Sequence, residues 1–151
     1  MSITKMFANL FVGELLKNKK INLNKNVSYY LPKIGSGYAN AKVQDILNMN
    51  VVNAYTEDYT KAYSSSFMHE PVGGWRLPKS GQIKLSQEQY LNTIKKIKNR
   101  GLKNNSDYAL YKSANTDVIG LIIEKISGIP LRDWVLSTCL LYTSPSPRDI
   151  S

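Results

Sequence analysis

Residues 2–17 read Ser-Ile-Thr-Lys-Met-Phe-Ala-Asn-Leu-Phe-Val-Gly-Glu-Leu-Leu-Lys. Apolar residues recur there at spacings of three and four, which predicts an amphipathic helix with one buried face. The positions expected on that face are Ile3, Met6, Phe7, Leu10, Phe11 and Leu15. Because Ser2 and Lys5 are three residues apart, their side chains are expected on one face of the first turn.

This Ser-x-x-Lys pair suits nucleophilic catalysis. A serine hydroxyl becomes a good nucleophile when a base takes its proton, and a lysine kept neutral by its surroundings can be that base. Backbone N–H groups at a helix start also favour developing negative charge. The alternative is that Ser2 only caps the helix and Lys5 is solvated. An N-terminal nucleophile freed by loss of Met1 is disfavoured, because that chemistry usually begins on a strand.

Composition excludes several classes of protein. The chain has 151 residues, 42% hydrophobic and 21% charged, which is typical of one soluble globular domain. No apolar run reaches the roughly 18 residues that a membrane span needs. One cysteine (Cys139) and one histidine (His69) predict neither a disulfide framework nor a metal site, and no cofactor is expected. The net charge is +9, but the lysines are dispersed without interleaved aromatics, so no nucleic-acid partner is expected.

The middle of the chain is irregular. A turn is predicted at Gly35-Ser36-Gly37 and a short helix over 41–48. Residues 50–82 lack periodicity, and a loop of that length is usually functional or disordered. Its many aromatic residues argue against disorder. We therefore expect a folded loop that lines a site, with Tyr59 and Trp75 as candidate substrate-supporting residues.

Three helices are predicted further along. Ser86 and Gln89 form a capping box at the start of one. Residues 115–127 are apolar most of the way round, which predicts a central buried helix. Gly128 should end it, and Pro130 should be the first residue of the last helix, which carries Trp134. The apolar positions of the central helix are Val118, Ile119, Leu121, Ile122, Ile123 and Ile126.

The composition changes sharply after residue 139. Residues 140–151 resemble translated adapter or vector sequence and are excluded from fold reasoning; a natural disordered C-terminus is the alternative. The folded part is therefore predicted to be one partial domain over residues 1–139.

Five motifs occur in an order that is typical of one family. They are the Ser-Ile-Thr-Lys start, residues 20–32, residues 43–49, the Tyr-Lys-Ser-Ala-Asn-Thr-Asp stretch over 111–117, and the apolar run to Gly128. Together they resemble the penicillin-recognising serine hydrolases of the class C β-lactamase type. That family includes D,D-peptidases, esterases and 6-aminohexanoate-dimer hydrolases. The 111–117 motif and Gly-Trp-Arg-Leu-Pro at 74–78 are most similar to the dimer-hydrolase and esterase branch.

The resemblance implies a fold and a set of roles. The fold would be mainly α: the helical domain of a β-lactamase/transpeptidase-like α+β fold, with the antiparallel-sheet domain largely missing. Ser2 would be the acylated nucleophile, Lys5 its base and Tyr111 a second proton-transfer group. Ser113 stands where many relatives have Asn, which weakens the case for β-lactam hydrolysis. Asn115 would be a supporting polar group.

The expected reaction is hydrolysis of a small amide or ester through an acyl-enzyme on Ser2. Within the family the alternatives are a cell-wall D,D-peptidase or a class C β-lactamase, and outside it a helical binding module without catalysis. Relatives in this family occur in the bacterial cytoplasm, in the periplasm and at the membrane, so the resemblance leaves the compartment open. Without the sheet, the isolated chain should expose an apolar patch and have little or no activity.

Overall fold

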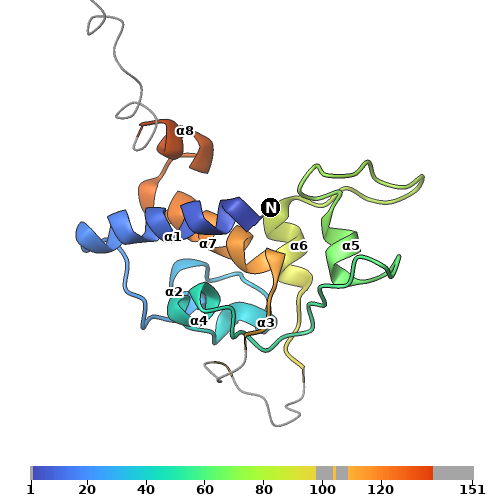
Figure 1. Cartoon of the computed structure of the whole chain (residues 1–151), viewed down its shortest axis with the longest axis horizontal. Helices are drawn as coiled ribbons and strands as arrows, with labels where there is room; N and C mark the ends of the chain where they lie inside the picture. Colours follow the sequence, from blue (N-terminus) through green and yellow to red (C-terminus); the bar gives the residue numbers. More distant parts are fainter. Residues whose placement is uncertain (1, 98–103, 105–108, 138–151) are drawn as a thin grey trace, which may run out of the picture.

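The computed structural model describes residues 2–97, 104 and 109–137, and these residues form an assembly of helices (Figure 1). The helices are α1 (Ser2–Lys17), α2 (Val27–Tyr30), α3 (Ser36–Ala39), α4 (Val43–Leu47), α5 (Ser65–His69), α6 (Gln87–Thr93), α7 (Ser113–Ser127) and α8 (Leu131–Val135). The described part contains no strand, only one isolated antiparallel bridge between Asn26 and Lys42. The mainly α prediction is confirmed for this part of the chain.

Helix α7 is the centre of the fold. It contacts α1, α2, α4, α5, α6 and α8, and Figure 1 shows α1 lying along it. Val118, Ile122 and Ile123 are fully buried, as the apolar sequence predicted. Gly128 ends the helix with a φ of 74°, in the left-handed region that favours glycine. The next helix begins one residue later than predicted, with Pro130 as its N-cap.

Helix α1 has the predicted length, but the prediction of its buried face is partly wrong. Phe11 and Leu15 are buried, together with Val12, which was not predicted. The ring of Phe11 packs edge-on against Trp134 of α8, with centroids 5.1 Å apart. Packing on α7 and α8 covers only this edge of the helix. The other edge forms the expected exposed apolar patch: Met6 (72% exposed), Phe7 (49%) and Leu10 (60%).

The smaller elements agree with the sequence in part. Ser86 and Gln89 make both hydrogen bonds of the predicted capping box at α6. The turn prediction at 35–37 is wrong, because Ser36–Ala39 winds into the one-turn helix α3. The Gly37 N–H donates to the Ile94 carbonyl at 3.0 Å, and a Cβ at Gly37 would lie 2.8 Å from that oxygen, so glycine allows the backbone to approach the end of α6 this closely. Helix α2 was not predicted, since four residues are too few to show a period.

Two glycines make a matched pair for a stability measurement. A Cβ at Gly37 would lie 2.8 Å from the Ile94 carbonyl oxygen, whereas a Cβ at Gly13 in α1 meets nothing within 4 Å. We expect Gly37→Ala to lower the free energy of unfolding by about 1–3 kcal/mol through overpacking. Gly13→Ala should raise it by about 0.5–1 kcal/mol through helix propensity. Urea unfolding followed by circular dichroism measures both free energies of unfolding. Equal changes in the two variants would contradict the close approach of Gly37 to Ile94.

None of the helices in the described part of the chain combines the length and apolar character that a bilayer span requires. Cys139 and the predicted tail over 140–151 lie outside the described residues.

Candidate active site

A cavity of ≈ 330 Å³ opens between α1, the start of α7 and the segment around α5. Its volume is in the range of small-molecule sites in proteins. Residues from four separate stretches of sequence line it, among them Lys5, Tyr59, His69, Trp75, Gln87, Ser113 and Asp117. The irregular segment 50–82 therefore lines a cavity, as its aromatic content predicted.

Lys5 and Tyr111 meet beside this cavity. The Lys5 ammonium nitrogen lies 4.4 Å from the centroid of the Tyr111 ring, over its face. Lys5 is half-buried and Tyr111 is 47% exposed. Ser2 is the first residue of α1, one turn before Lys5, so the backbone brings these two positions to the same end of the helix. The Lys5 ammonium thus makes a cation–π contact with the Tyr111 ring.

Ser113 occupies the first position of α7, where it contacts a residue that the sequence did not single out. The Glu57 carboxylate accepts hydrogen bonds from the Ser113 N–H at 2.9 Å and from the Ser113 hydroxyl at 2.6 Å. The Tyr59 hydroxyl also donates to Glu57 and lies 3.3 Å from the Ser113 hydroxyl oxygen. Glu57 stands in no motif, so only its spatial position reveals it.

Asn115 is fully buried and is not among the residues that line this cavity. Its side-chain oxygen accepts a hydrogen bond from the Tyr38 hydroxyl at 3.0 Å, and its amide nitrogen donates to the Ile46 carbonyl at 3.2 Å. These bonds join α7 to α3 and α4. The residue can support the site through the position of α7, without contact with a ligand in that cavity.

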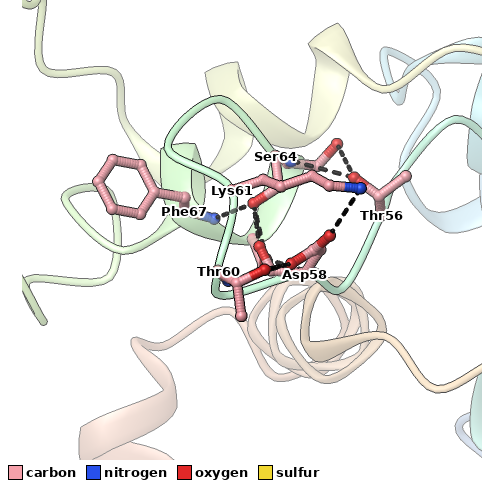
Figure 2. A network of polar contacts seen from close by, with 8 residues as sticks. Thr56, Asp58, Thr60, Lys61, Ser64 and Phe67 are labelled. Atoms are coloured by element: carbon pink, nitrogen blue, oxygen red, sulfur yellow. Dashed lines mark hydrogen bonds and ion pairs between the residues drawn. The ribbon is translucent and has the colours of Figure 1, made fainter.

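The segment that carries Tyr59 is held by a local polar network (Figure 2). The Asp58 carboxylate accepts from the Thr60 hydroxyl at 2.7 Å and pairs with the Lys61 amine at 3.2 Å. The Ser64 hydroxyl donates to the Asp58 carbonyl and accepts from the Phe67 N–H at 3.2 Å, which caps α5. The network gives this irregular segment a defined conformation beside α7.

Trp75 forms another wall of the cavity while remaining 66% exposed. Its indole lies against the backbone of Gly73, where an added Cβ would come within 2.7 Å of the ring. The next residue, Arg76, is anchored by an ion pair with Glu70 at 3.0 Å and by a hydrogen bond to the Phe67 carbonyl at 2.9 Å. A glycine and an anchored arginine thus place the indole at the rim.

His69 and Asp117 form a second polar group in the cavity wall that the sequence reasoning missed. The His69 Nε2 lies 2.8 Å from an Asp117 carboxylate oxygen, off the direction in which its N–H would donate. The His69 Nδ1 lies 3.2 Å from the Tyr55 hydroxyl, and the ring stacks on Tyr90 at 4.6 Å. Burial raises the pKa of Tyr55, so its hydroxyl keeps its proton and can donate to Nδ1. The single histidine of the chain thus joins α5 to α7.

Opposing effects act on Glu57. Its partial burial raises the pKa of the carboxyl, but hydrogen bonds from Ser113 and Tyr59 and the positive charge of Lys5 outweigh burial and hold the pKa below its ordinary value. Burial likewise lowers the pKa of Lys112, whose amine donates to the Tyr55 carbonyl at 2.7 Å. The charges around the start of α7 are therefore arranged about an ionised Glu57.

This arrangement predicts a pH dependence of stability. Since the pKa of Glu57 is lower in the folded chain than in the unfolded chain, its contribution is complete above the unfolded value of about 4.3 and is lost as the pH falls through the folded value. We expect the wild type to lose more unfolding free energy than Glu57→Gln when the pH falls from about 5 to about 3. Urea titrations at both pH values measure the difference, and parallel losses would contradict it.

Among the described residues, no group of three or more His, Cys, Asp or Glu side chains is placed to hold a metal ion.

No family model matches the chain. The chain is 31% identical, over 150 residues, to the 6-aminohexanoate-dimer hydrolase of Paenarthrobacter ureafaciens; the match covers 99% of this chain and 36% of the relative. A solved structure from Bacillus anthracis, provisionally named a 6-aminohexanoate-dimer hydrolase, superposes with a TM-score of 0.71. That match has 18% sequence identity and covers 90% of this chain and 35% of the other.

The sequence match and the structural match cover similar shares of the two relatives. The chain spans about a third of the length of each relative, and the described part is helical, as expected for the helical part of a β-lactamase-like fold. The sequence match extends over nearly the whole chain, and the matched relative is named as a hydrolase. Over nearly its whole length, this chain is accordingly similar to a 6-aminohexanoate-dimer hydrolase, about one third of whose length it spans.

Proposed function

We propose that the chain carries the acylating residues of a serine hydrolase that cleaves small amides or esters, with Ser2 as the nucleophile and Lys5 and Tyr111 as proton-transfer groups. The observation that supports this most is the contact of Lys5 with Tyr111, 4.4 Å from nitrogen to ring centroid, on the helix that begins at Ser2. Residues so distant in sequence meet beside a cavity lined by Tyr59, Trp75 and Ser113. Nucleophile, base and binding surface would then share one site.

In the proposed reaction, the Ser2 hydroxyl oxygen bonds to the substrate carbonyl carbon while its proton passes to Lys5 or Tyr111. The carbonyl electron pair moves to the oxygen, which the Ser2 backbone N–H and a second donor stabilise. Collapse of the tetrahedral intermediate expels the amine or alcohol, which takes up the proton. Water then hydrolyses the acyl ester and restores the hydroxyl.

The name of the relative and the lining of the cavity support a substrate class for this proposal. The Paenarthrobacter protein is named for a dimer of 6-aminohexanoate, a linear amide. In this chain the cavity combines the Trp75 indole and Val72 with polar groups at the start of α7. We infer a linear amide or ester whose apolar stretch would lie on the indole.

Activity-based probes test the proposal on the 151-residue chain. A fluorophosphonate should add its mass once, and Ser2→Ala should abolish the addition; no addition to the wild type would contradict the proposal. Labelling by a fluorescent penicillin would favour the D,D-peptidase or β-lactamase alternative. Labelling by neither probe would favour a binding module without catalysis.

Turnover should differ from single labelling. Because the chain spans 36% of the relative, we expect little or no hydrolysis of p-nitrophenyl acetate above the Ser2→Ala background. Slow labelling with negligible turnover is the predicted combination. Rapid Ser2-dependent turnover would show that the remaining two thirds are not required.

A further inference from the structure

Arg76 is bound to the end of α5 and to the chain beside it through its whole guanidinium group. The Nε donates to a Glu70 carboxylate oxygen at 3.0 Å, and one terminal nitrogen donates to the Phe67 carbonyl at 2.9 Å. The other terminal nitrogen donates to the Leu77 carbonyl at 3.4 Å. The guanidinium carbon lies over the Phe67 ring, 4.0 Å from its centroid. A planar group with a charge-assisted pair, further donors and a stacked face is restricted to one position.

The backbone before Arg76 turns back on the same anchor. The Trp75 N–H donates to the Glu70 carbonyl at 2.9 Å. Gly74, the residue before it, has a φ of 76°, in the left-handed region that favours glycine. Two consecutive residues are therefore bonded to Glu70, Trp75 through the Glu70 carbonyl and Arg76 through the Glu70 carboxylate.

The Trp75 indole depends on this support because little of the protein covers it. The residue is largely exposed, although it lines the cavity together with Val72 and Gly73. Close packing holds a buried ring in place, whereas an exposed ring is held mainly through its own backbone and the residues beside it. The contacts of Arg76 therefore decide where this wall of the cavity stands.

We propose that Arg76 is a positioning residue that fixes the Trp75 indole as one wall of the cavity and thereby favours substrates with a long apolar stretch over short ones. The inference rests on the proposed function, because this selectivity has a meaning only if Ser2 is acylated. Arg76 contacts no reacting atom in this role and transfers no proton. It holds the indole in place before the substrate binds, so that an apolar chain contacts a surface that is already ordered.

The mobility of the indole tests the structural part of the proposal on the full chain. The protein has two tryptophans, so ¹⁵N relaxation of the indole N–H groups reports on Trp75 and, as an internal reference, on the buried Trp134. We expect an order parameter of about 0.85 for Trp75 in the wild type and below about 0.6 in Arg76→Met, with Trp134 unchanged. A Trp75 indole that stays ordered in Arg76→Met would overturn the proposal.

Two variants separate the geometry of the guanidinium from its charge. Arg76→Lys keeps the charge but cannot bond to Glu70 and to the Phe67 carbonyl at once, so Trp75 should again become mobile. Lys79→Met removes the other cation over the Phe67 ring, 5.2 Å from its centroid, and should leave Trp75 ordered. An ordered indole in Arg76→Lys, or a mobile one in Lys79→Met, would overturn the role of the guanidinium. If Arg76→Met does not fold, the wild type still decides, because a mobile Trp75 indole there overturns the proposal.

Acylation of Ser2 tests the selectivity and distinguishes it from the function on which it rests. The probes are an ethyl and an octyl fluorophosphonate, and the readout is the ratio of their second-order labelling rates, octyl to ethyl. Arg76→Met should lower this ratio about tenfold, and Lys79→Met should leave it unchanged. A general loss of stability would slow both probes alike and would not move the ratio.

The two possible failures give different results. If neither probe labels the wild type, the proposed function fails and the selectivity role of Arg76 fails with it. If both probes label Ser2 and the ratio is the same in Arg76→Met as in the wild type, only the inference about Arg76 fails.

Discussion

Lys5→Ala is expected to slow the acylation of Ser2 by a fluorophosphonate by about 10²- to 10⁴-fold, the usual contribution of a general base. The substitution removes the amine one turn from Ser2 and leaves the helix intact, since alanine is the best helix former. It also removes the cation from the face of Tyr111. The measurement is the second-order rate of labelling by intact-protein mass spectrometry.

Two further variants show whether a slower rate comes from the loss of the Lys5 amine itself. Lys84→Ala, in the exposed part of the segment before α6, removes a lysine outside the cavity and should leave the labelling rate unchanged. Tyr111→Phe keeps the ring on which Lys5 rests but removes the phenol oxygen. If Tyr111→Phe lowers the labelling rate about as much as Lys5→Ala does, the phenol takes part in proton transfer. Full labelling of Lys5→Ala would exclude the amine as the base.

Ile122→Ala is expected to lower the free energy of unfolding by about 2–5 kcal/mol. Ile122 is completely buried in α7, the helix that contacts six of the other helices in the described part of the chain. Loss of its side chain removes apolar burial and leaves a cavity that rigid neighbours cannot fill. Urea unfolding measures the change, which is a large fraction of the stability of an ordinary domain.

Ile83→Ala is the matched control, because the same atoms are removed from a side chain that is 81% exposed. Its effect should stay within about 0.5 kcal/mol. Similar losses in the two variants would mean that α7 is not the core of this chain.

The sequence alone determined the parts of this protein that depend on local patterns. Periodicity was enough to predict helices α1 and α7, because their apolar positions repeat over several turns. Residue types at fixed short spacings were enough to predict the Ser86–Gln89 capping box and the end of α7 at Gly128. The candidate pair Ser2 and Lys5 belongs to the same class, since three residues of helix set its geometry.

Only the tertiary structure decided which faces are covered and which distant residues meet. Met6, Phe7 and Leu10 have the same apolar character as Phe11, yet α7 and α8 cover only the edge that bears Phe11. Glu57 carries no signal in its own segment, because its partner Ser113 is 56 residues away. Local patterns record how a segment folds, whereas the contacts of Glu57 and the meeting of Lys5 with Tyr111 follow from how the segments pack.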